Sequence, residues 1–384
     1  MIDKMIKENK NCMGCHACDN TCPTQCITMM PDNEGFLYPK VDYSQCIKCK
    51  RCISVCPIIN KIKVDNNPQA YVSINKDELI RLDSSSGGIF TLIAEKTING
   101  KGVVFGAGYT NNFEIEHKYV DKIEAISELR GSKYVQSKIG NSYKQTKDFL
   151  DAGREVLFSG TPCQIAGLNS YLKKSYENLI TQDFICHGVP SPKVWREYIE
   201  FRENEAKSKV SRVAFRNKDE GWKKFSITFS FQNDMKYKKN LRKDPYLKAF
   251  LRDVCLRPSC YECEFKGLNR QSDVTLADFW GIEKFLPDLD DDKGTSLVLV
   301  NSELGNRLFN SIKDKIEYQE VNLDQVIKFN SAAIKSSKYN PKREFFFSDL
   351  DSLPFNKLVN KYCDESFLVK LKRKAKRAFI KVLR

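Results

Sequence analysis

The middle of the chain alternates short apolar runs with helical patterns. The apolar runs at 70–74, 102–107, 155–160 and 179–186 are rich in Val, Ile, Leu and Phe, which is typical of buried strands. Helical patterns begin at 89, 165 and 194. Because strands that alternate with helices form parallel βαβ units, this part of the chain predicts an α/β domain with a mostly parallel sheet.

Further strands are predicted on either side of this pattern. Residues 213–215 and 225–231 predict added antiparallel strands, and the second of these runs alternates apolar and polar positions. Residues 27–30 and 36–38 flank an Asp-Asn-Glu-Gly turn and predict a short hairpin within an α+β module. We divide the chain into a module at 1–60, a polar linker at 61–70, two parts of a larger domain at 71–150 and 151–330, and a tail at 366–384.

Cysteine is the residue type that most changes this picture. The chain has 384 residues and 15 cysteines, and nine of them fall between Cys12 and Cys56. No apolar run approaches the roughly 18 residues of a membrane-spanning helix, and the first residues lack a secretory apolar region, so we expect a cytoplasmic protein. Clustered thiols in such a protein indicate metal binding rather than disulfides.

Two copies of one cysteine motif lie 34 residues apart near the start of the chain. Each copy has the spacing C-x2-C-x2-C-x3-C-P of bacterial ferredoxins, in which the fourth cysteine binds the other cluster. We therefore expect one [4Fe–4S] cluster on Cys12, Cys15, Cys18 and Cys56, and a second on Cys46, Cys49, Cys52 and Cys22. The alternative is a pair of zinc sites, which quartets that each end in Cys-Pro fit poorly.

A third group of cysteines lies in the second half of the chain. Cys255, Cys260 and Cys263 have a C-x4-C-x2-C spacing, which predicts a third [4Fe–4S] cluster with a distant fourth ligand. Cys163 and Cys186 are the candidates for that ligand, because both follow predicted strands and the ends of parallel strands meet at one sheet edge. Cys363 is a weaker candidate, and a zinc site or reduced structural thiols are the alternatives.

A small-residue loop precedes the first predicted helix of the larger domain. Ser86, Gly87 and Gly88 lead into the helical pattern at 89–96, and free backbone N–H groups at such a helix start can bind an anion. A plain helix cap with a flexible turn explains the same residues.

Several short motifs together resemble the β subunit of coenzyme F420-reducing hydrogenases and dehydrogenases, in the form with a fused N-terminal ferredoxin. The motifs are Ser86-Gly87-Gly88, the run from Arg130 to Gln136, Gly160-Thr161-Pro162-Cys163-Gln164, the run from Cys186 to Pro192, the third cysteine group, and the run from Asp273 to Gly281. The resemblance implies an FAD-binding α/β domain with an iron–sulfur cluster close to the flavin. It places Ser86, Gly87 and Gly88 at the flavin pyrophosphate, Lys133 and Tyr134 near the flavin, and Gly160 and Thr161 in the loop between flavin and cluster.

Single residues and the tail add further candidates. Lys133 could stabilise a reduced flavin, and His187 could donate a proton to a substrate, although a surface lysine and a turn histidine are the alternatives. The net charge is +14, and eight Lys or Arg with no acid lie between Ser366 and Arg384. The tail predicts a basic amphipathic helix that contacts a membrane surface or an acidic partner, and its lack of an aromatic platform argues against nucleic acid.

Taken together, the sequence predicts an iron–sulfur flavoprotein oxidoreductase. We expect electrons to pass between a redox partner protein or reduced carrier, the clusters, FAD and a small organic substrate. The resemblance is to bacterial members found with polysaccharide-synthesis machinery. A non-catalytic electron-transfer subunit and a zinc-stapled interaction protein are the alternative functions.

Overall fold

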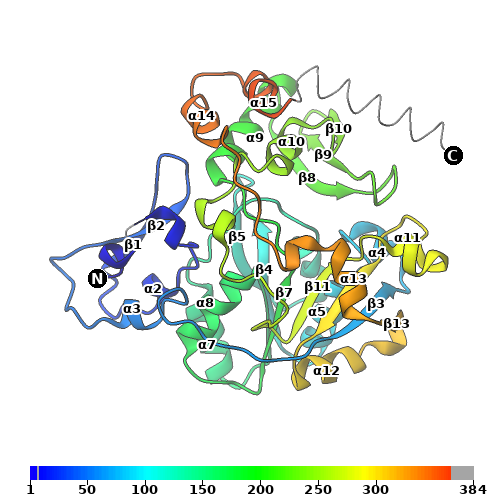
Figure 1. The fold of residues 1–384 in the computed structure, drawn as a ribbon, viewed down its shortest axis with the longest axis horizontal. Helices are drawn as coiled ribbons and strands as arrows, with labels where there is room; N and C mark the ends of the chain where they lie inside the picture. The colour runs from blue at the N-terminus through cyan, green and yellow to red at the C-terminus, as the bar shows by residue number, and fades with distance from the viewer. Residues whose placement is uncertain (7, 365–384) are drawn as a thin grey trace.

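A single large sheet forms the centre of the computed structural model, which describes residues 1–6 and 8–364. The basic tail expected at 366–384 lies outside the described residues. The strand order is β13-β3-β12-β11-β7-β6-β4-β5 (Figure 1). The strands are β3 (Gln69–Asn75), β4 (Val103–Tyr109), β5 (Ile115–Val120), β6 (Val156–Ser159), β7 (Leu179–Phe184), β11 (Val274–Asp278), β12 (Ser296–Val300) and β13 (Ile316–Val321).

The sheet is mixed, so the expectation of a mostly parallel sheet is wrong for its outer half. Only the neighbours β4–β6, β6–β7 and β7–β11 pair in parallel among the described strands, and the other neighbours in this sheet are antiparallel. Between β11 and β12 the chain forms only the short α11 (Ile282–Phe285), a 3-10 turn and loops. Because a parallel neighbour needs a long crossover, this short connection returns β12 antiparallel to β11.

Helices cover both faces of the sheet. One face packs against α5 (Ile89–Asn99), α6 (Ile126–Leu129) and α12 (Glu303–Asn310), and the other against α7 (Ser142–Asp151) and α8 (Pro162–Leu172). Successive residues of a strand point to opposite faces, so Val104 packs under α5 while Phe105 packs under α7 and α8. The alternation of strand and helix therefore buries apolar side chains on both sides of the parallel strands.

A smaller antiparallel sheet lies beside the large one, at the top of Figure 1. It consists of β8 (Val210–Asn217), β9 (Ser226–Phe231) and β10 (Lys236–Asn240), which confirms the predicted antiparallel strands. Its core includes residues of α9 (Pro192–Ala206), α10 (Pro245–Leu251), α14 (Arg343–Ser348) and α15 (Phe355–Cys363). Trp195 is the largest side chain buried there.

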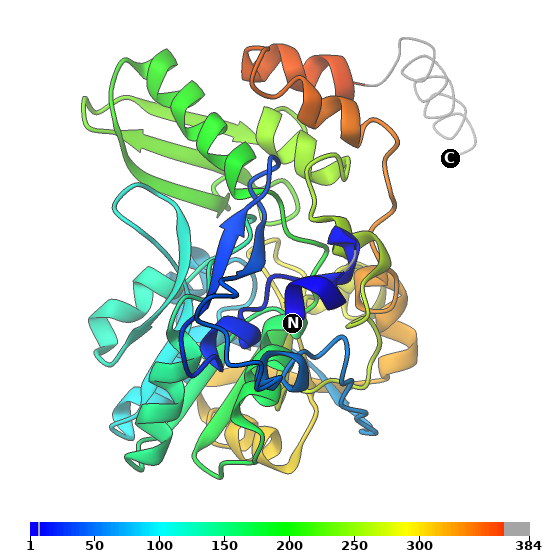
Figure 2. The same cartoon turned by 90° about the vertical axis from the view of Figure 1, so that its left-hand side faces the viewer.

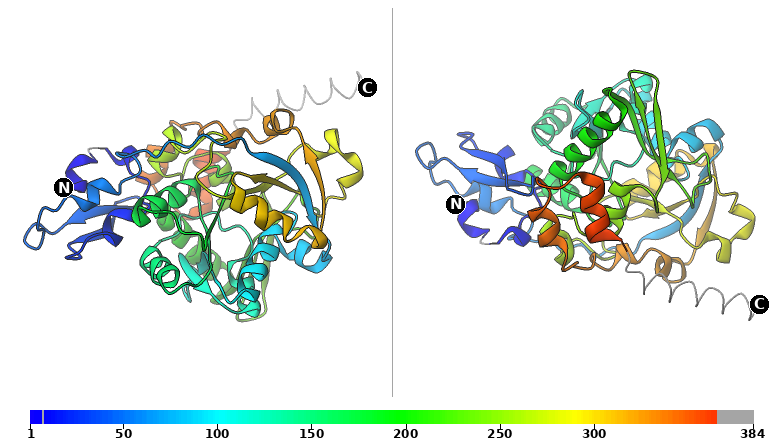
Figure 3. Two further views of the ribbon diagram at one scale, coloured as in Figure 1. Left: turned by 90° about the horizontal axis from the view of Figure 1, so that it is seen from below. Right: turned by 90° about the horizontal axis from the view of Figure 1, so that it is seen from above.

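The N-terminal module projects from one side of the molecule (Figure 3), and Figure 2 looks directly onto it. It contains α1 (Ile2–Met5), α2 (Ala17–Asn20), α3 (Arg51–Ser54) and the predicted hairpin of β1 (Ile27–Pro31) and β2 (Leu37–Val41). The helix α2 contacts α7 and α8 of the large domain. Along the predicted linker, Lys61 forms an ion pair with Glu264, and the amide of Asn66 donates to the carbonyl of Arg270. No helix among the described residues is long and apolar enough to cross a bilayer.

Candidate functional site

The first cysteine motif of the module lies next to the fourth cysteine of the second motif. Cys15 and Cys18 of the first motif lie close to Cys12 and to Cys56, which comes from the second motif. The pKa of Cys15 is raised to about 12, first by burial and then by the neighbouring Cys12 and Cys56. The backbone N–H of Gly14 also donates to the sulfur of Cys12, at 3.4 Å. The structure thus brings the four expected ligands of the first cluster together.

The second set of cysteines lies on the outer side of the module. Cys46 is half-buried, Cys49 is exposed and Cys52 is buried. The sulfur of Cys22 is 3.4 Å from that of Cys26, which in turn lies close to Cys46. Cys26, which the motif spacing leaves over, therefore sits next to the second set.

A third site forms where strands of the large sheet end. Cys163 is the second residue of α8, directly after β6, and Cys186 follows β7. Both line one cavity together with Cys260 and Cys263, which come from the 3-10 turn at 258–262 and the residue after it. The structure therefore gathers both candidates for the fourth ligand, and four cysteines face the same space.

Cys255 does not belong to this group, so the expected ligand set needs a correction. Cys255 is fully buried in the core of the small sheet, and the neighbouring cysteine there is Cys363. The backbone of Leu256 pairs with Pro190, and the chain turns toward the cavity only at Pro258. The side chain of Cys255 precedes that turn and points into the apolar core instead.

The sulfurs of the cavity lie in a buried environment that disfavours their ionisation. Burial raises the pKa of Cys163 well above its usual range and that of Cys186 to about 11. The neighbouring cysteines act in the same direction as burial on both pKa values, whereas Lys266 and Arg270 act against it at Cys186. Four thiolates can share this cavity only if positive charge compensates their mutual repulsion. No three His, Cys, Asp or Glu side chains of the described residues converge tightly enough to hold a single metal ion.

Arg257 supplies buried positive charge between this cavity and the module. Its side chain is fully buried and lines the cavity. The guanidinium donates to the carbonyl of Cys12 at 2.7 Å, to the carbonyl of Leu37 at 2.9 Å and to the amide oxygen of Gln136 at 2.9 Å. These partners are neutral, and within the described chain no carboxylate forms an ion pair with Arg257. A buried cation without an anion is costly, so its position indicates a negative group nearby.

Two further cations line the same cavity. Lys266 donates to the carbonyl oxygens of Cys186 and Ala332. Arg270 is 4 % exposed, and one of its nitrogens lies 3.5 Å from a carboxylate oxygen of Asp183. Its Nε and Nη2 are buried without a hydrogen-bond partner among the described atoms. Unsatisfied buried donors of this kind fit a site that receives an anionic group.

The helix α8 connects this cavity to the first cluster site. Cys163 lies in its first turn, and Gly167 lies four residues later, which places both residues on one helix face. A Cβ atom on Gly167 would lie 2.9 Å from the Cβ of Cys15 and 3.1 Å from its sulfur. Glycine at this position therefore lets Cys15 of the module pack directly against the helix that carries Cys163.

A second, larger cavity of about 380 Å³ lies between the two sheets. Its lining combines cations, aromatic rings and small hydroxyls with the carboxylates of Asp83 and Glu128. Asp83 forms ion pairs with Arg130 at 2.7 Å and with Arg212 at 3.8 Å. The other lining residues include Lys133, Arg216, Tyr109, Phe113, Phe215, Ser84 and Ser85. The amine of Lys133 donates to the carbonyls of residues 129–131, and burial lowers its pKa to about 7, with a further contribution from Lys118. The lining suits a ligand with both an anionic part and a flat ring.

Aromatic side chains connect the two cavities. His187 lines the cysteine cavity, and its ring meets that of Phe250 edge-on at 5.2 Å. Phe250 stacks on Tyr134 at 4.8 Å, and Tyr134 meets Phe215 of the second cavity at 5.5 Å. Tyr134 thus lies between the cavities, where its hydroxyl accepts from Arg216 at 3.1 Å. His187 is also fixed by Asp253, whose carboxylate lies 2.6 Å from Nε2.

The structure assigns packing roles to the glycine loop. A Cβ on Gly87 would lie 2.5 Å from the carbonyl oxygen of Ser73, and the N–H of Gly87 donates to the hydroxyl of Ser296. Gly88 caps α5 with a φ of 83°. Ser84 and Ser85 line the second cavity, whereas the predicted residues Ser86, Gly87 and Gly88 are not among its lining residues.

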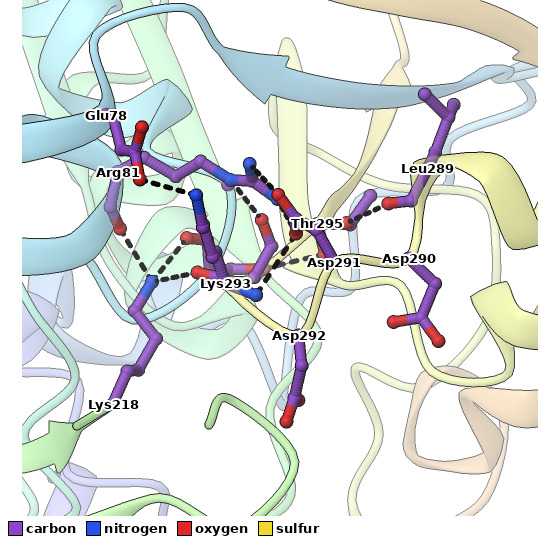
Figure 4. A network of polar contacts seen from close by, with 12 residues as sticks. Glu78, Arg81, Lys218, Leu289, Asp290, Asp291, Asp292, Lys293 and Thr295 are labelled. Atoms are coloured by element: carbon purple, nitrogen blue, oxygen red, sulfur yellow. Dashed lines mark hydrogen bonds and ion pairs between the residues drawn. The ribbon is translucent and has the colours of Figure 1, made fainter. Parts of the chain in front are cut away.

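A buried polar network, which the sequence did not predict, holds this loop in place (Figure 4). The amine of Lys218 donates to the carbonyls of Arg81, Ser86 and Lys293 at 2.6–3.0 Å. Arg81 in turn forms a bidentate pair with Asp291 at 2.6 and 2.7 Å. The network fastens residues 84–86 to the loop before β12 and so fixes one wall of the second cavity.

Thr161 lines the cysteine cavity, and neither Gly160 nor Thr161 lines the second cavity. Thr161 caps α8 in a reciprocal capping box with Gln164, and its hydroxyl lies 3.0 Å from the sulfur of Cys163. Gly160 packs behind this turn, where a Cβ would lie 3.2 Å from Gln164. Both residues therefore position the start of the helix that carries Cys163.

The fold and these sites define an iron–sulfur electron-transfer protein, in which a two-motif ferredoxin module is docked on an α/β domain. Residues 11–59 match the 4Fe-4S dicluster domain, and residues 153–326 match the family described as the C terminus of the coenzyme F420 hydrogenase/dehydrogenase beta subunit. The part of the chain at 153–326 is thus similar to this beta-subunit family, and a ferredoxin domain lies on its N-terminal side, which confirms the resemblance seen in the sequence.

Two individual proteins are also similar to this chain. An uncharacterized polyferredoxin-like protein of Methanocaldococcus jannaschii is 27% identical over 84 residues, which are 18% of this chain and 50% of that protein. The chain thus matches half the length of this relative. A chain of the F420-reducing [NiFe] hydrogenase complex of Methanosarcina barkeri aligns over 71% of this chain and 90% of its own length, with 15% identity and a TM-score of 0.49.

Proposed function

We propose that this protein is an iron–sulfur oxidoreductase that passes single electrons between an external carrier and an organic substrate. Two [4Fe–4S] clusters would lie in the module, and a third would bind Cys163, Cys186, Cys260 and Cys263. The observation that carries this proposal is the convergence of these four cysteines in one cavity next to the module. Four thiolates and no other ligand type are the donor set of a [4Fe–4S] cluster.

The charge around the cavity supports a cluster there. A cubane with four thiolate ligands carries net negative charge, and it becomes more negative when it is reduced. Arg257, Lys266 and Arg270 line the cavity, and Arg270 keeps two buried donors without partners among the described atoms. The three side chains would balance the charge of the cluster without moving, because neighbouring groups already hold them in place.

We further propose that the second cavity binds a flavin, as the family resemblance implies. A volume of about 380 Å³ lies within the range of about 300–1,000 Å³ for cofactor sites, and its lining offers cations and rings. A bound flavin would convert between two-electron chemistry on a substrate and one-electron transfer to clusters. Arg130 and Arg212 would bind its phosphates, and the ammonium of Lys133 would stabilise negative charge on its ring. Ser86, Gly87 and Gly88 would shape the wall behind Ser84 and Ser85.

The second candidate function is a non-catalytic electron-transfer subunit that feeds a separate enzyme. The module and the cysteine cavity serve both functions equally, whereas the second cavity favours the enzyme. The substrate itself and a role in polysaccharide synthesis remain predictions from the family resemblance.

The proposed third cluster is tested by iron and sulfide analysis of anaerobically purified protein. We expect about twelve irons in the wild type and about eight in Cys163→Ser and Cys260→Ser, because each [4Fe–4S] cluster contributes four. Cys255→Ala is the matched control and keeps about twelve, since Cys255 lies outside the cavity. About eight irons in the wild type, or an equal loss in the control, would refute the assignment of the third site.

Flavin analysis of the same preparation separates the two candidate functions. The enzyme predicts about one FAD per chain, released by heat, and a loss of that FAD in the double variant Arg130→Ala/Arg212→Ala. An electron-transfer subunit predicts clusters without flavin, even after incubation with excess FAD. Zinc in place of iron would refute both functions.

A further inference from the structure

The outer face of the ferredoxin module differs from its inner face in two ways: its side chains are more exposed and it carries more positive charge. The inner face carries the first cysteine set, and Cys15 packs against Gly167 of the large domain. The outer face carries the second set, in which Cys49 is exposed. We infer that this outer face, defined as Tyr43 to Arg51, is the docking surface for a small acidic one-electron carrier protein. The inference rests on the proposed electron-transfer function.

The internal repeat of 34 residues allows a direct comparison of the two faces. The outer residues Ile47, Lys48, Lys50 and Arg51 correspond in the repeat to Met13, Gly14, His16 and Ala17. The backbone conformation is retained, since φ is 66° at Gly14 and 57° at Lys48, and 63° at His16 and 60° at Lys50. The two faces therefore differ in their side chains and not in their backbone.

The inner residues are all buried by the body of the protein. Met13, His16 and Ala17 are at most 8 % exposed, and Met13 lines the cysteine cavity. A Cβ on Gly14 would lie 2.9 Å from the guanidinium of Arg257, so no side chain fits there. The first motif thus shows how a protein surface covers this face of a cluster-binding loop.

The outer residues have nothing that covers them within the described chain. Ile47 is 64 % exposed, although its counterpart Met13 is buried. Tyr43 and Met5 are exposed large apolar side chains of the same module. Met5 belongs to α1, which packs against α3 and β2 of the module. Exposed apolar groups next to a redox centre are what a partner protein would bury on docking.

The charge of the outer face selects the kind of partner. Lys48, Lys50 and Arg51 are exposed and take part in no ion pair among the residues that the structure describes. Lysine is uncommon at a positive φ, where glycine is favoured, yet the outer loop has lysine at two such positions. Two carboxylates lie nearby: Asp42 is hydrogen-bonded to Ser44, and Asp3 accepts from the hydroxyl of Tyr43. The remaining positive charge complements an acidic surface.

Docking at this face brings the redox centre of the carrier close to the second cluster. One electron leaves the cluster of the reduced carrier, which is oxidised by one electron, and reduces the second cluster of the module by one electron. No proton or bond is transferred in this step. Charge complementarity accelerates such an encounter at low ionic strength, because it steers the partners into contact.

The test uses an acidic bacterial 2[4Fe–4S] ferredoxin as the probe and titanium(III) citrate as a small reductant. Stopped-flow absorbance measures the second-order rate constant for reduction of the full chain between about 20 and 500 mM NaCl. We expect Lys48→Glu/Lys50→Glu/Arg51→Glu to lower the ferredoxin rate constant at least tenfold at low salt and to abolish its salt dependence. The rate with titanium(III) citrate should not change.

The matched control reverses three charges elsewhere on the molecule. Lys236→Glu/Lys239→Glu/Lys243→Glu makes the same charge change at exposed positions on and after β10, in the small sheet. This variant should keep the wild-type salt dependence and lose less than about twofold in rate. A loss equal to that of the first variant would show an effect of net charge alone and would overturn the docking surface.

Two further measurements separate failure of docking from failure of the protein. Iron analysis verifies that the charge variant retains its clusters. If the charge variant loses iron, Ile47→Ser is used instead, because it leaves all charges in place. Ile47→Ser should weaken binding of the oxidised ferredoxin, measured by calorimetry, by fivefold or more. Wild-type protein that titanium(III) citrate cannot reduce would refute the proposed function. Wild-type rates in both variants with ferredoxin would refute the docking surface only.

Discussion

Arg257 contacts both the cysteine cavity and the first motif of the module. It lines the cysteine cavity, and at the same time it bonds the carbonyl of Cys12 in the first motif of the module. Its ring contacts are with Tyr38 at 4.3 Å and Phe36 at 5.5 Å, so the charge is surrounded by apolar groups and neutral oxygens. A cation in such surroundings stabilises the more negative, reduced form of a nearby cluster.

We expect Arg257→Gln to lower the reduction potential of the first or third cluster. A loss of about 1 kcal/mol of electrostatic stabilisation corresponds to about 40 mV for a one-electron couple. Redox titration followed by electron paramagnetic resonance measures the shift. Arg257→Lys, which keeps the charge, should shift the potentials less. Equal potentials in wild type and Arg257→Gln, with full iron content, would contradict this role.

Lys133 gives the second cavity a pH dependence. Its pKa in the folded protein is about 7, against an ordinary value of 10.5, because the side chain is buried. The amine is charged below pH 7 and neutral above it, so the dissociation constant for FAD should rise several-fold between pH 6 and 8.5. Fluorescence titration measures this change, and Lys133→Met should bind FAD more weakly with a flatter pH profile. A pH profile unchanged by the substitution would exclude Lys133.

The lowered pKa of Lys133 also makes the stability of the protein depend on pH. A lysine in an ion pair, whose pKa is raised, would give the opposite dependence. Between pH 7 and 10.5 the unfolded chain binds a proton that the folded chain does not. The free energy of unfolding should therefore rise with pH through this window by the contribution of Lys133. Urea unfolding of wild type and Lys133→Met at pH 7 and 9 isolates that contribution.

At the scale of helices and strands, α8 is the element on which the site depends. Its capping box fixes the first turn with Cys163, and Gly167 in the next turn admits Cys15. We expect Gly167→Val to force the module away from the helix, at a cost of about 1–3 kcal/mol. Iron content should fall by up to four per chain. Ser170→Ala on the same helix is the control and should keep all iron. A Gly167→Val protein with unchanged melting temperature and iron would contradict the close contact.

Local patterns predicted the parallel strands but not their neighbours. The runs at 102–107, 155–160 and 179–186 became β4, β6 and β7, because continuous apolar stretches are buried on both faces. The fully buried run Ser296–Val300 became β12 in the middle of the sheet, and no local pattern reveals that it separates β3 from β11. Pairing is decided by connections between distant segments, so the sequence indicated strands more reliably than sheet order.

The cysteine sites, like the sheet, could be predicted only where a local sequence pattern determines the structure. The repeated motif predicted that Cys56 lies with the first motif, because the spacing is a known pattern, whereas the place of Cys22 in the second cluster stays a prediction. Strand ends correctly brought Cys163 and Cys186 to one edge. The spacing of Cys255, Cys260 and Cys263 misled, because it does not report which way a side chain points. Arg257 and Arg270 carried no sequence signal, since isolated arginines are ordinary surface residues.

On the scale of the whole molecule, the module contacts the body at several separate places. Its inner face contacts α8, and the turn of its hairpin contacts the C-terminal part, where Glu34 forms a bidentate pair with the buried Arg343 of α14. The hydroxyl of Ser191 also donates to the carbonyl of Glu34. Two contacts on different sides prevent rotation of the module about either one.

Removing the pair of Glu34 with Arg343 should increase the mobility of the hairpin without loss of iron from the module. We expect Glu34→Gln to cost about 1–3 kcal/mol, because it leaves the guanidinium of Arg343 without its anion. Hydrogen exchange measured by mass spectrometry should increase in residues 31–36 and 343–348, while the iron content stays constant. Arg196→Ala, which removes an exposed ion pair with Glu114 and no contact with the module, is the control and should have little effect. Unchanged exchange in Glu34→Gln would show that the pair with Arg343 does not hold the module.

The contact of Cys15 with Gly167 also sets the conditions under which electrons can cross from the module to the cysteine cavity. Four residues of helix rise by only about 6 Å, and this length is as invariant as the backbone hydrogen bonds that define it. Electron transfer from the module to the cysteine cavity therefore requires no domain movement. Electron transfer between the first cluster and the proposed third cluster should therefore continue in viscous glycerol and in a frozen glass, where redox proteins with a mobile carrier domain no longer transfer electrons.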